Sequence, residues 1–106
     1  MAEHDLVRDD NGKTFEVQRG DTLVIKLPDN PTTGFRWAVD SFDQTIVTRV
    51  EENYSTASPA IGGGGLRRFA FRAEASGSSV IALKLWRSWE GDSSVRSRFQ
   101  VTVEVE

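Results

Sequence analysis

Residues 98–105 read Arg-Phe-Gln-Val-Thr-Val-Glu-Val and carry the clearest structural signal in the chain. The apolar residues Phe99, Val101, Val103 and Val105 alternate strictly with polar ones. A period of two places alternate side chains on opposite faces of a β-strand, and β-branched residues favour that conformation. This segment therefore predicts a strand with one face buried in a core.

The same period of two recurs earlier in the chain. The clearest examples lie at residues 21–27, 35–40, 68–73 and 80–85. The stretch 80–85 is apolar on both faces, which predicts a central strand. A strand with poorer alternation is expected over residues 46–54. No segment shows a convincing helical period.

Turn residues separate these strands. Asp9-Asp10-Asn11-Gly12 predicts a turn between two brief edge strands, and Pro28-Asp29-Asn30-Pro31 is expected to end the strand at 21–27. Seven to eight short strands with such spacing predict an all-β fold, an immunoglobulin-like antiparallel β-sandwich. A small closed barrel is the alternative fold.

Composition narrows the class of protein. The 106 residues suit a single domain over 1–106, and 38% hydrophobic with 27% charged residues is typical of a globular protein. The net charge of -3 argues against a nucleic-acid binder, and no apolar run is long enough to span a membrane. The N-terminus lacks signal-peptide features, so we expect a cytoplasmic protein or the mature form of an exported one.

An enzymatic function is poorly supported. The chain has one histidine and no cysteine, which excludes a cysteine nucleophile and a thiolate metal site. Adjacent acids such as Glu51 and Glu52 point to opposite faces of a strand, so they do not converge on a substrate. We therefore expect no catalytic residues, no metal and no cofactor.

Three connections between the predicted strands have unusual composition. Asn30-Pro31-Thr32-Thr33-Gly34-Phe35 combines turn residues with stiff threonines, Gly62-Gly63-Gly64-Gly65 exposes its backbone, and Arg87-Ser88-Trp89 offers two residue types enriched in binding hot spots. Successive antiparallel strands alternate in direction, so every second connection lies at the same end of a sandwich. The three loops are therefore expected to cluster into one surface that grips another protein.

These loops resemble, in order and spacing, the three motifs of the chagasin-like inhibitors of papain-type cysteine proteases. The match at residues 30–35, followed by Trp37, is complete, and residues 62–65 correspond to Gly-x-Gly-Gly. The third motif, Arg-Pro-Trp, has Ser88 in place of proline. The resemblance implies an immunoglobulin-like sandwich and reversible, competitive occlusion of the protease cleft.

The resemblance also implies roles for individual residues. Residues 30–35 form the wedge at the active site, with Thr32 beside the catalytic dyad. Residues 62–65 flank the non-primed side, and Arg87 with Trp89 packs on the primed side. The implied partners are papain and cathepsin L-like enzymes, bound by a monomer that contacts neither nucleic acid nor membrane. Ser88 is expected to loosen the third loop and weaken some complexes.

The tryptophans are expected to divide between core and surface. Trp37 alternates with Phe35 and Val39, which predicts a core position. Trp89 lies among polar loop residues, which predicts an exposed contact residue. The alternative function is a non-inhibitory adhesion or binding module, in which Trp86 and Trp89 stack on sugar rings beside Glu90.

Overall fold

The computed structural model describes residues 2–29, 34–55 and 65–106. Within these ranges the chain forms eight strands: β1 (Glu3–Leu6), β2 (Thr14–Val17), β3 (Thr22–Asp29), β4 (Arg36–Ser41), β5 (Val47–Ser55), β6 (Gly65–Ala73), β7 (Gly77–Trp86) and β8 (Ser97–Val105). Short 3-10 helices are η1 (Arg8–Asp10), η3 (Ser88–Glu90) and η4 (Asp92–Ser94). The described part of the chain contains no helix long and apolar enough to cross a membrane.

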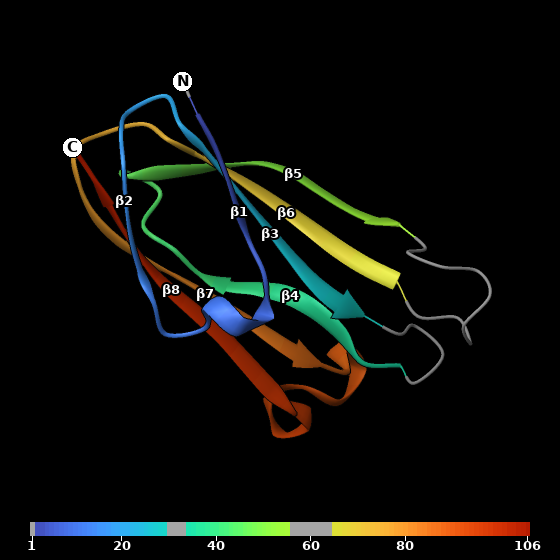
Figure 1. Cartoon of the computed structure of the whole chain (residues 1–106). Helices are drawn as coiled ribbons and strands as arrows, with labels where there is room; N and C mark the ends of the chain where they lie inside the picture. Colours follow the sequence, from blue (N-terminus) through green and yellow to red (C-terminus); the bar gives the residue numbers. More distant parts are fainter. Residues whose placement is uncertain (1, 30–33, 56–64) are drawn as a thin grey trace.

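The strands form two packed sheets, with the orders β1-β3-β6-β5 and β2-β8-β7-β4 (Figure 1). This arrangement confirms the predicted immunoglobulin-like sandwich. The sheets are mixed rather than antiparallel, because β1 pairs with β3 and β2 pairs with β8 in parallel. A period of two in the sequence fixes which face of a strand is buried, but it does not encode the direction of the neighbouring strand.

The core lies between the two sheets and is built from their alternating apolar residues. The largest fully buried side chains are Phe69, Phe71, Phe99, Leu6, Leu23, Ile25, Leu27, Ile81 and Leu83. The rings of Phe42 and Phe71 meet edge to face, with centroids 5.3 Å apart. All four apolar residues of the predicted strand 98–105 are buried in β8, as expected from their alternation.

Strand β7 occupies the position that the sequence predicts, although one of its two apolar faces is exposed. β7 lies between β8 and β4, so it is a central strand as predicted. Its outer face is nevertheless open to solvent, since Val80 is 44% exposed. The sandwich has two layers, and no other strand or 3-10 helix of the described residues forms a third layer over this face.

Strand β3 extends beyond its predicted end at Pro28. Pro28 pairs with Leu66 and Asp29 with Gly65 in the antiparallel ladder with β6. The Pro28 carbonyl oxygen accepts a hydrogen bond from the Trp37 indole Nε1–H at 2.8 Å. In a strand the amide nitrogen and the carbonyl of one residue point to the same side. Because the Pro28 carbonyl points to Trp37, the side of Pro28 that lacks an N–H also faces away from β6. Proline therefore fits here without loss of a ladder hydrogen bond.

Three connections leave the sandwich at the same end, which we call the loop end. Two of them follow β3 and β5 in one sheet, where Asp29 pairs with Gly65 and Ser55 with Leu66. The third follows β7 in the other sheet, close to the start of β4 (Figure 1). The described ends of β3, β5 and β7 therefore lie at the same end of the sandwich, while residues 30–33 and 56–64 of two of these connections lie outside the described residues.

Candidate functional site

The β7–β8 connection, residues 87–96, folds into two consecutive 3-10 turns. The Glu90 amide donates to the Arg87 carbonyl at 3.0 Å, and the Ser94 amide donates to the Gly91 carbonyl at 3.0 Å. Gly91 joins the turns with a φ of 78°, a conformation that disfavours residues with a side chain. The Arg96 amide closes the base of the loop on the Leu85 carbonyl at 2.8 Å.

Ser94 ties the two halves of this loop together. Its Oγ accepts a hydrogen bond from the Arg87 amide at 3.0 Å. The same hydroxyl lies 2.9 Å from the Arg87 carbonyl and 2.7 Å from the Gly91 carbonyl, so its single proton is shared between two acceptors. These contacts fix the loop around Ser88, the position where the resemblance led us to expect a looser chain.

Trp89 joins the third loop to the end of the first. Trp89 is 70% exposed, as predicted, yet one edge of its indole rests on Gly34. A Cβ atom placed on Gly34 would lie only 2.8 Å from Cη2 of Trp89. Gly34 also has a φ of 82°, so both its backbone conformation and this close contact require glycine.

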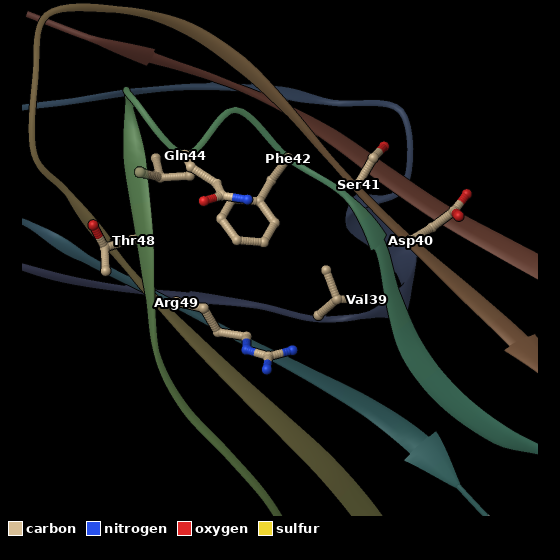
Figure 2. Close-up of a pocket in the computed structure, with 8 residues that line it drawn as sticks. Val39, Asp40, Ser41, Phe42, Gln44, Thr48 and Arg49 are labelled. Atoms are coloured by element: carbon tan, nitrogen blue, oxygen red, sulfur yellow. The ribbon is translucent and has the colours of Figure 1, made fainter.

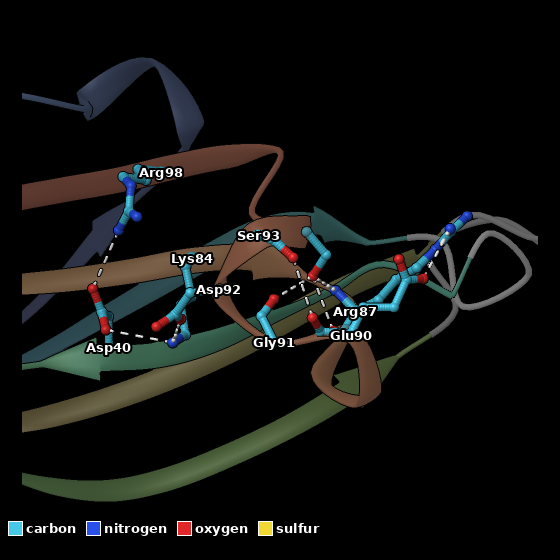
Figure 3. A network of polar contacts seen from close by, with 9 residues as sticks. Asp40, Lys84, Arg87, Glu90, Gly91, Asp92, Ser93 and Arg98 are labelled. Atoms are coloured by element: carbon cyan, nitrogen blue, oxygen red, sulfur yellow. Dashed lines mark hydrogen bonds and ion pairs between the residues drawn. The ribbon is translucent and has the colours of Figure 1, made fainter.

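Phe35 lies beneath two guanidinium groups. The Arg87 Cζ atom is 4.4 Å from the centroid of the Phe35 ring, and the Arg96 Cζ atom is 5.1 Å from it. Such distances are within the range of cation–π attraction. Arg87 also forms an ion pair with Glu90 at 3.2 Å (Figure 3). The half-buried Phe35 thus connects β4 to both sides of the β7–β8 loop.

A network of ion pairs runs along the outer face of the second sheet (Figure 3). Lys84 Nζ lies 3.0 Å from Asp92 and 3.6 Å from Asp40, and Arg98 lies 3.4 Å from Asp40. Lys84 Nζ also sits 3.6 Å from the centroid of the Trp86 ring and so covers one face of that ring. The network anchors the η4 turn to the sheet.

Two concave regions of the described residues bear on the site. One lies at the loop end and is lined by Gly34, Arg36, Trp86, Ser88 and Trp89. The other is an open hollow of about 710 Å³ between the edge strands β4 and β5, where Figure 2 shows the ring of Phe42. It is lined by Val39, Asp40, Ser41, Phe42, Gln44, Val47, Thr48 and Arg49. Only the first includes residues of the predicted loops.

The structure brings part of the predicted site together. Gly34, Phe35, Arg87 and Trp89 are in contact or share one cluster, and Ser88 lines the adjacent hollow. Gly65 begins β6 at the same end of the sandwich. The remaining predicted residues, Asn30, Pro31, Thr32, Thr33, Gly62, Gly63 and Gly64, lie outside the described residues.

Sequence reasoning did not single out three residues of this region. Arg36 lies in the alternating stretch 35–40, next to the buried Trp37, and the structure places it on the outer face of the strand. Ser94 and Arg96 carry no motif, and their roles depend on how the loop folds back on itself. Among residues 2–29, 34–55 and 65–106, no cluster of three or more histidine, aspartate or glutamate side chains is placed to hold a metal ion.

The opposite end of the sandwich, which we call the terminal end, is braced by Asp21. Its carboxylate accepts the Ala2 amide at 2.9 Å and the Gln18 amide at 3.1 Å, and lies 3.0 Å from His4 Nε2. The hydrogen bond from His4, then those from the two amides, lowers the pKa of Asp21 from 3.8 to about 2. The ionised carboxylate thus holds β1 against the turn that precedes β3.

Comparison with known proteins agrees with this arrangement. Residues 16–103 match the family model described as chagasin family peptidase inhibitor I42. Chagasin from Trypanosoma cruzi is 32% identical over 103 residues, which cover 92% of this chain and 94% of chagasin. The match confirms the resemblance inferred from the three loop motifs, and with it a role as an inhibitor rather than an enzyme.

Solved structures show the same fold. The cysteine protease inhibitor EhICP2 from Entamoeba histolytica has a TM-score of 0.91 over 100% of this chain and 97% of its own, at 21% identity. PbICP-C, whose structure is a complex with falcipain-2, has a TM-score of 0.67 over 100% of both chains, at 16% identity. Together with the family match over residues 16–103, the evidence places this chain in the chagasin family of peptidase inhibitors.

Proposed function

We propose that the loop end of this protein enters the active-site cleft of a papain-family cysteine protease and blocks it reversibly. The inhibitor works by occupying the cleft in competition with substrate, and it performs no chemistry of its own. Membership of the chagasin family supports this proposal, as does the related fold of PbICP-C in its complex with falcipain-2.

The observation that carries the proposal is the contact between Trp89 and Gly34. Trp89 is 70% exposed, and yet its indole edge is held against Gly34 of the first motif. A large aromatic group that is both exposed and fixed loses little conformational entropy when a partner covers it. Such residues are the usual hot spots of protein interfaces.

The remaining roles follow from this arrangement and from the family motifs. Residues 30–35 act as the wedge, with Thr32 nearest the catalytic dyad. Residues 62–65 run along the non-primed side, where a glycine backbone can approach the enzyme closely. Arg87 and Trp89 cover the primed side. The chain acts as a single domain, 1–106, and as a monomer.

Ser88 does not prevent this mode of binding. A proline in the third motif would restrict the backbone of the loop, but here Ser94 and the ion pair between Arg87 and Glu90 brace it instead. The loop is therefore preorganised by hydrogen bonds inside the turn.

Sugar binding is a weaker explanation for the exposed tryptophans. A sugar ring stacks on an open aromatic face, but Lys84 already covers one face of Trp86 at 3.6 Å from the centroid. Trp89 in turn has one edge seated on Gly34. Lys84 therefore leaves Trp86 at most one open face, and a sugar site with both tryptophans as open platforms is less well supported.

The direct test is titration of the purified protein against papain and a cathepsin L-like enzyme with a fluorogenic peptide substrate. We expect competitive inhibition at nanomolar concentrations, activity restored on dilution, and inhibitor recovered uncut. Absence of inhibition at micromolar protein, or progressive cleavage of residues 30–35, would contradict the proposal.

A further inference from the structure

The hollow at the loop end combines two aromatic rings with a cation. It is lined by Trp86, Trp89, Gly34 and Ser88, together with Arg36 at the start of β4. Arg36 is exposed and pairs across the sheet with Trp86, so both residues lie at the edge from which the β7–β8 loop rises. The hollow is therefore continuous with the proposed protease-binding surface.

The charges around this hollow are unequal. Five cations, Arg36, Lys84, Arg87, Arg96 and Arg98, stand near three carboxylates, Asp40, Glu90 and Asp92. The three carboxylates are already engaged, because Glu90 pairs with Arg87, Asp92 with Lys84, and Asp40 with Lys84 and Arg98. This part of the molecule is thus locally positive, although the whole chain has a net charge of -3.

Arg36 differs in its contacts from the other arginines around the hollow. Arg87 and Arg96 both lie over the Phe35 ring. No ion pair joins Arg36 to any other of the described residues, and Arg36 is one of the residues that line the hollow. When a protein partner covers the hollow, this charge loses water, and that loss is unfavourable unless an acceptor replaces the water.

We propose that Arg36, which lines the hollow together with Trp86 and Trp89, binds an aspartate or glutamate side chain on the primed-side rim of the target protease. A guanidinium pairs a carboxylate through two parallel hydrogen bonds, and the indole rings exclude water around such a pair. The inference rests on the proposed inhibitory function and adds a criterion for the target: it carries a carboxylate where Trp89 lands.

Two variants distinguish a specific contact of Arg36 with the protease from a general effect of the inhibitor's charge. Arg36→Gln removes the charge but keeps a polar side chain, and Arg72→Gln removes the same charge from an exposed residue of β6 outside the loop end. We expect Arg36→Gln to raise the inhibition constant by roughly tenfold and to flatten its dependence on sodium chloride. Arg72→Gln is expected to remain within about twofold of wild type.

The enzyme supplies the second half of the test. Carboxylates on the primed-side rim of the inhibited protease are neutralised one at a time, and the effect of Arg36→Gln is measured against each enzyme variant. We expect one neutralised carboxylate to abolish that effect. If Arg36→Gln inhibits like wild type at every salt concentration, or if no enzyme carboxylate is coupled to it, the inference is wrong while the inhibitory function stands. A wild-type protein that fails to inhibit would instead overturn the function itself.

Discussion

The two ends of the sandwich are each held by one polar side chain, but they differ in what they leave exposed. At the terminal end, Asp21 accepts two amides, contacts His4, and is itself buried. At the loop end, Ser94 bonds to both halves of the β7–β8 connection, and beside it Trp89 projects into solvent. The first brace closes the fold, whereas the second presents a surface.

This difference separates stability from recognition. Loss of the brace at the terminal end should free β1 and lower stability without changing the loops. Loss of contacts at the loop end should affect binding more than folding, because the exposed residues there bury little of the core. Variants at the two ends test this division.

The largest expected effect lies beneath the loops, at Trp37. This residue is 3% exposed and donates its indole N–H to Pro28, so it belongs to the core that supports the loop end. Trp37→Ala should lower the free energy of unfolding by about 3–5 kcal/mol. Urea denaturation measures the change, and a loss below about 1 kcal/mol would show that the core does not depend on this ring.

Trp89→Ala should weaken binding to the protease but leave the stability of the fold almost unchanged. We expect the free energy of unfolding to remain within about 0.5 kcal/mol of wild type. Binding should weaken by about 2 kcal/mol, or roughly thirtyfold, mainly through faster dissociation. Stopped-flow or surface-based kinetics with papain measure the rates. Unchanged dissociation would remove Trp89 from the interface.

Asp21→Asn tests the terminal end through its pH dependence. Because folding lowers the pKa of Asp21 to about 2, its ionised form stabilises the protein above the ordinary value of 3.8, and this contribution is lost as the pH falls through about 2. The variant should therefore be less stable than wild type at neutral pH, and the two should converge between pH 4 and pH 2. Inhibition at neutral pH should be unchanged. A stability difference that does not vary with pH would contradict this role.

The smallest expected effect is that of Ser94→Ala. Loss of the hydroxyl removes the hydrogen bond to the Arg87 amide and should lower stability by about 1 kcal/mol, with a severalfold rise in the inhibition constant. Ser93→Ala is the matched control, since the Ser93 hydroxyl is exposed and donates only to the Glu90 carbonyl at 3.3 Å. Equal effects of the two variants would show that Ser94 does not brace the loop.

Much of the fold could be predicted from alternation alone. Strict alternation in residues 98–105 identified β8, and the weaker pattern in 46–54 still located β5. The parallel pairing of β1 and β2 could not be predicted, because a four-residue strand carries no signal for the direction of its partner. The predicted strand ended before Pro28, whereas β3 continues to Asp29. The sequence does not reveal which side of a strand lacks a hydrogen-bonding partner, and so it does not show that proline is tolerated there.

The residues of the candidate site that belong to one of the three loop motifs could be predicted from the sequence. Trp89 was recognised as exposed because polar residues surround it in the chain. The contact between Trp89 and Gly34 joins residues far apart in sequence, and the stacking of Arg96 on Phe35 does likewise. Such contacts depend on two loops meeting in space, which neither composition nor local spacing encodes.

The central claim is that residues 30–35 at the loop end act as the wedge in the protease cleft. Its most direct test compares Thr32→Lys with Thr14→Lys, an identical change at an exposed position of β2. Both inhibition constants are measured against papain, with urea denaturation of each variant as a control for folding. We predict a loss of at least roughly hundredfold for Thr32→Lys, since a lysine at the catalytic centre would be both bulky and desolvated. Thr14→Lys should inhibit like wild type. Equal inhibition by both variants would contradict the account.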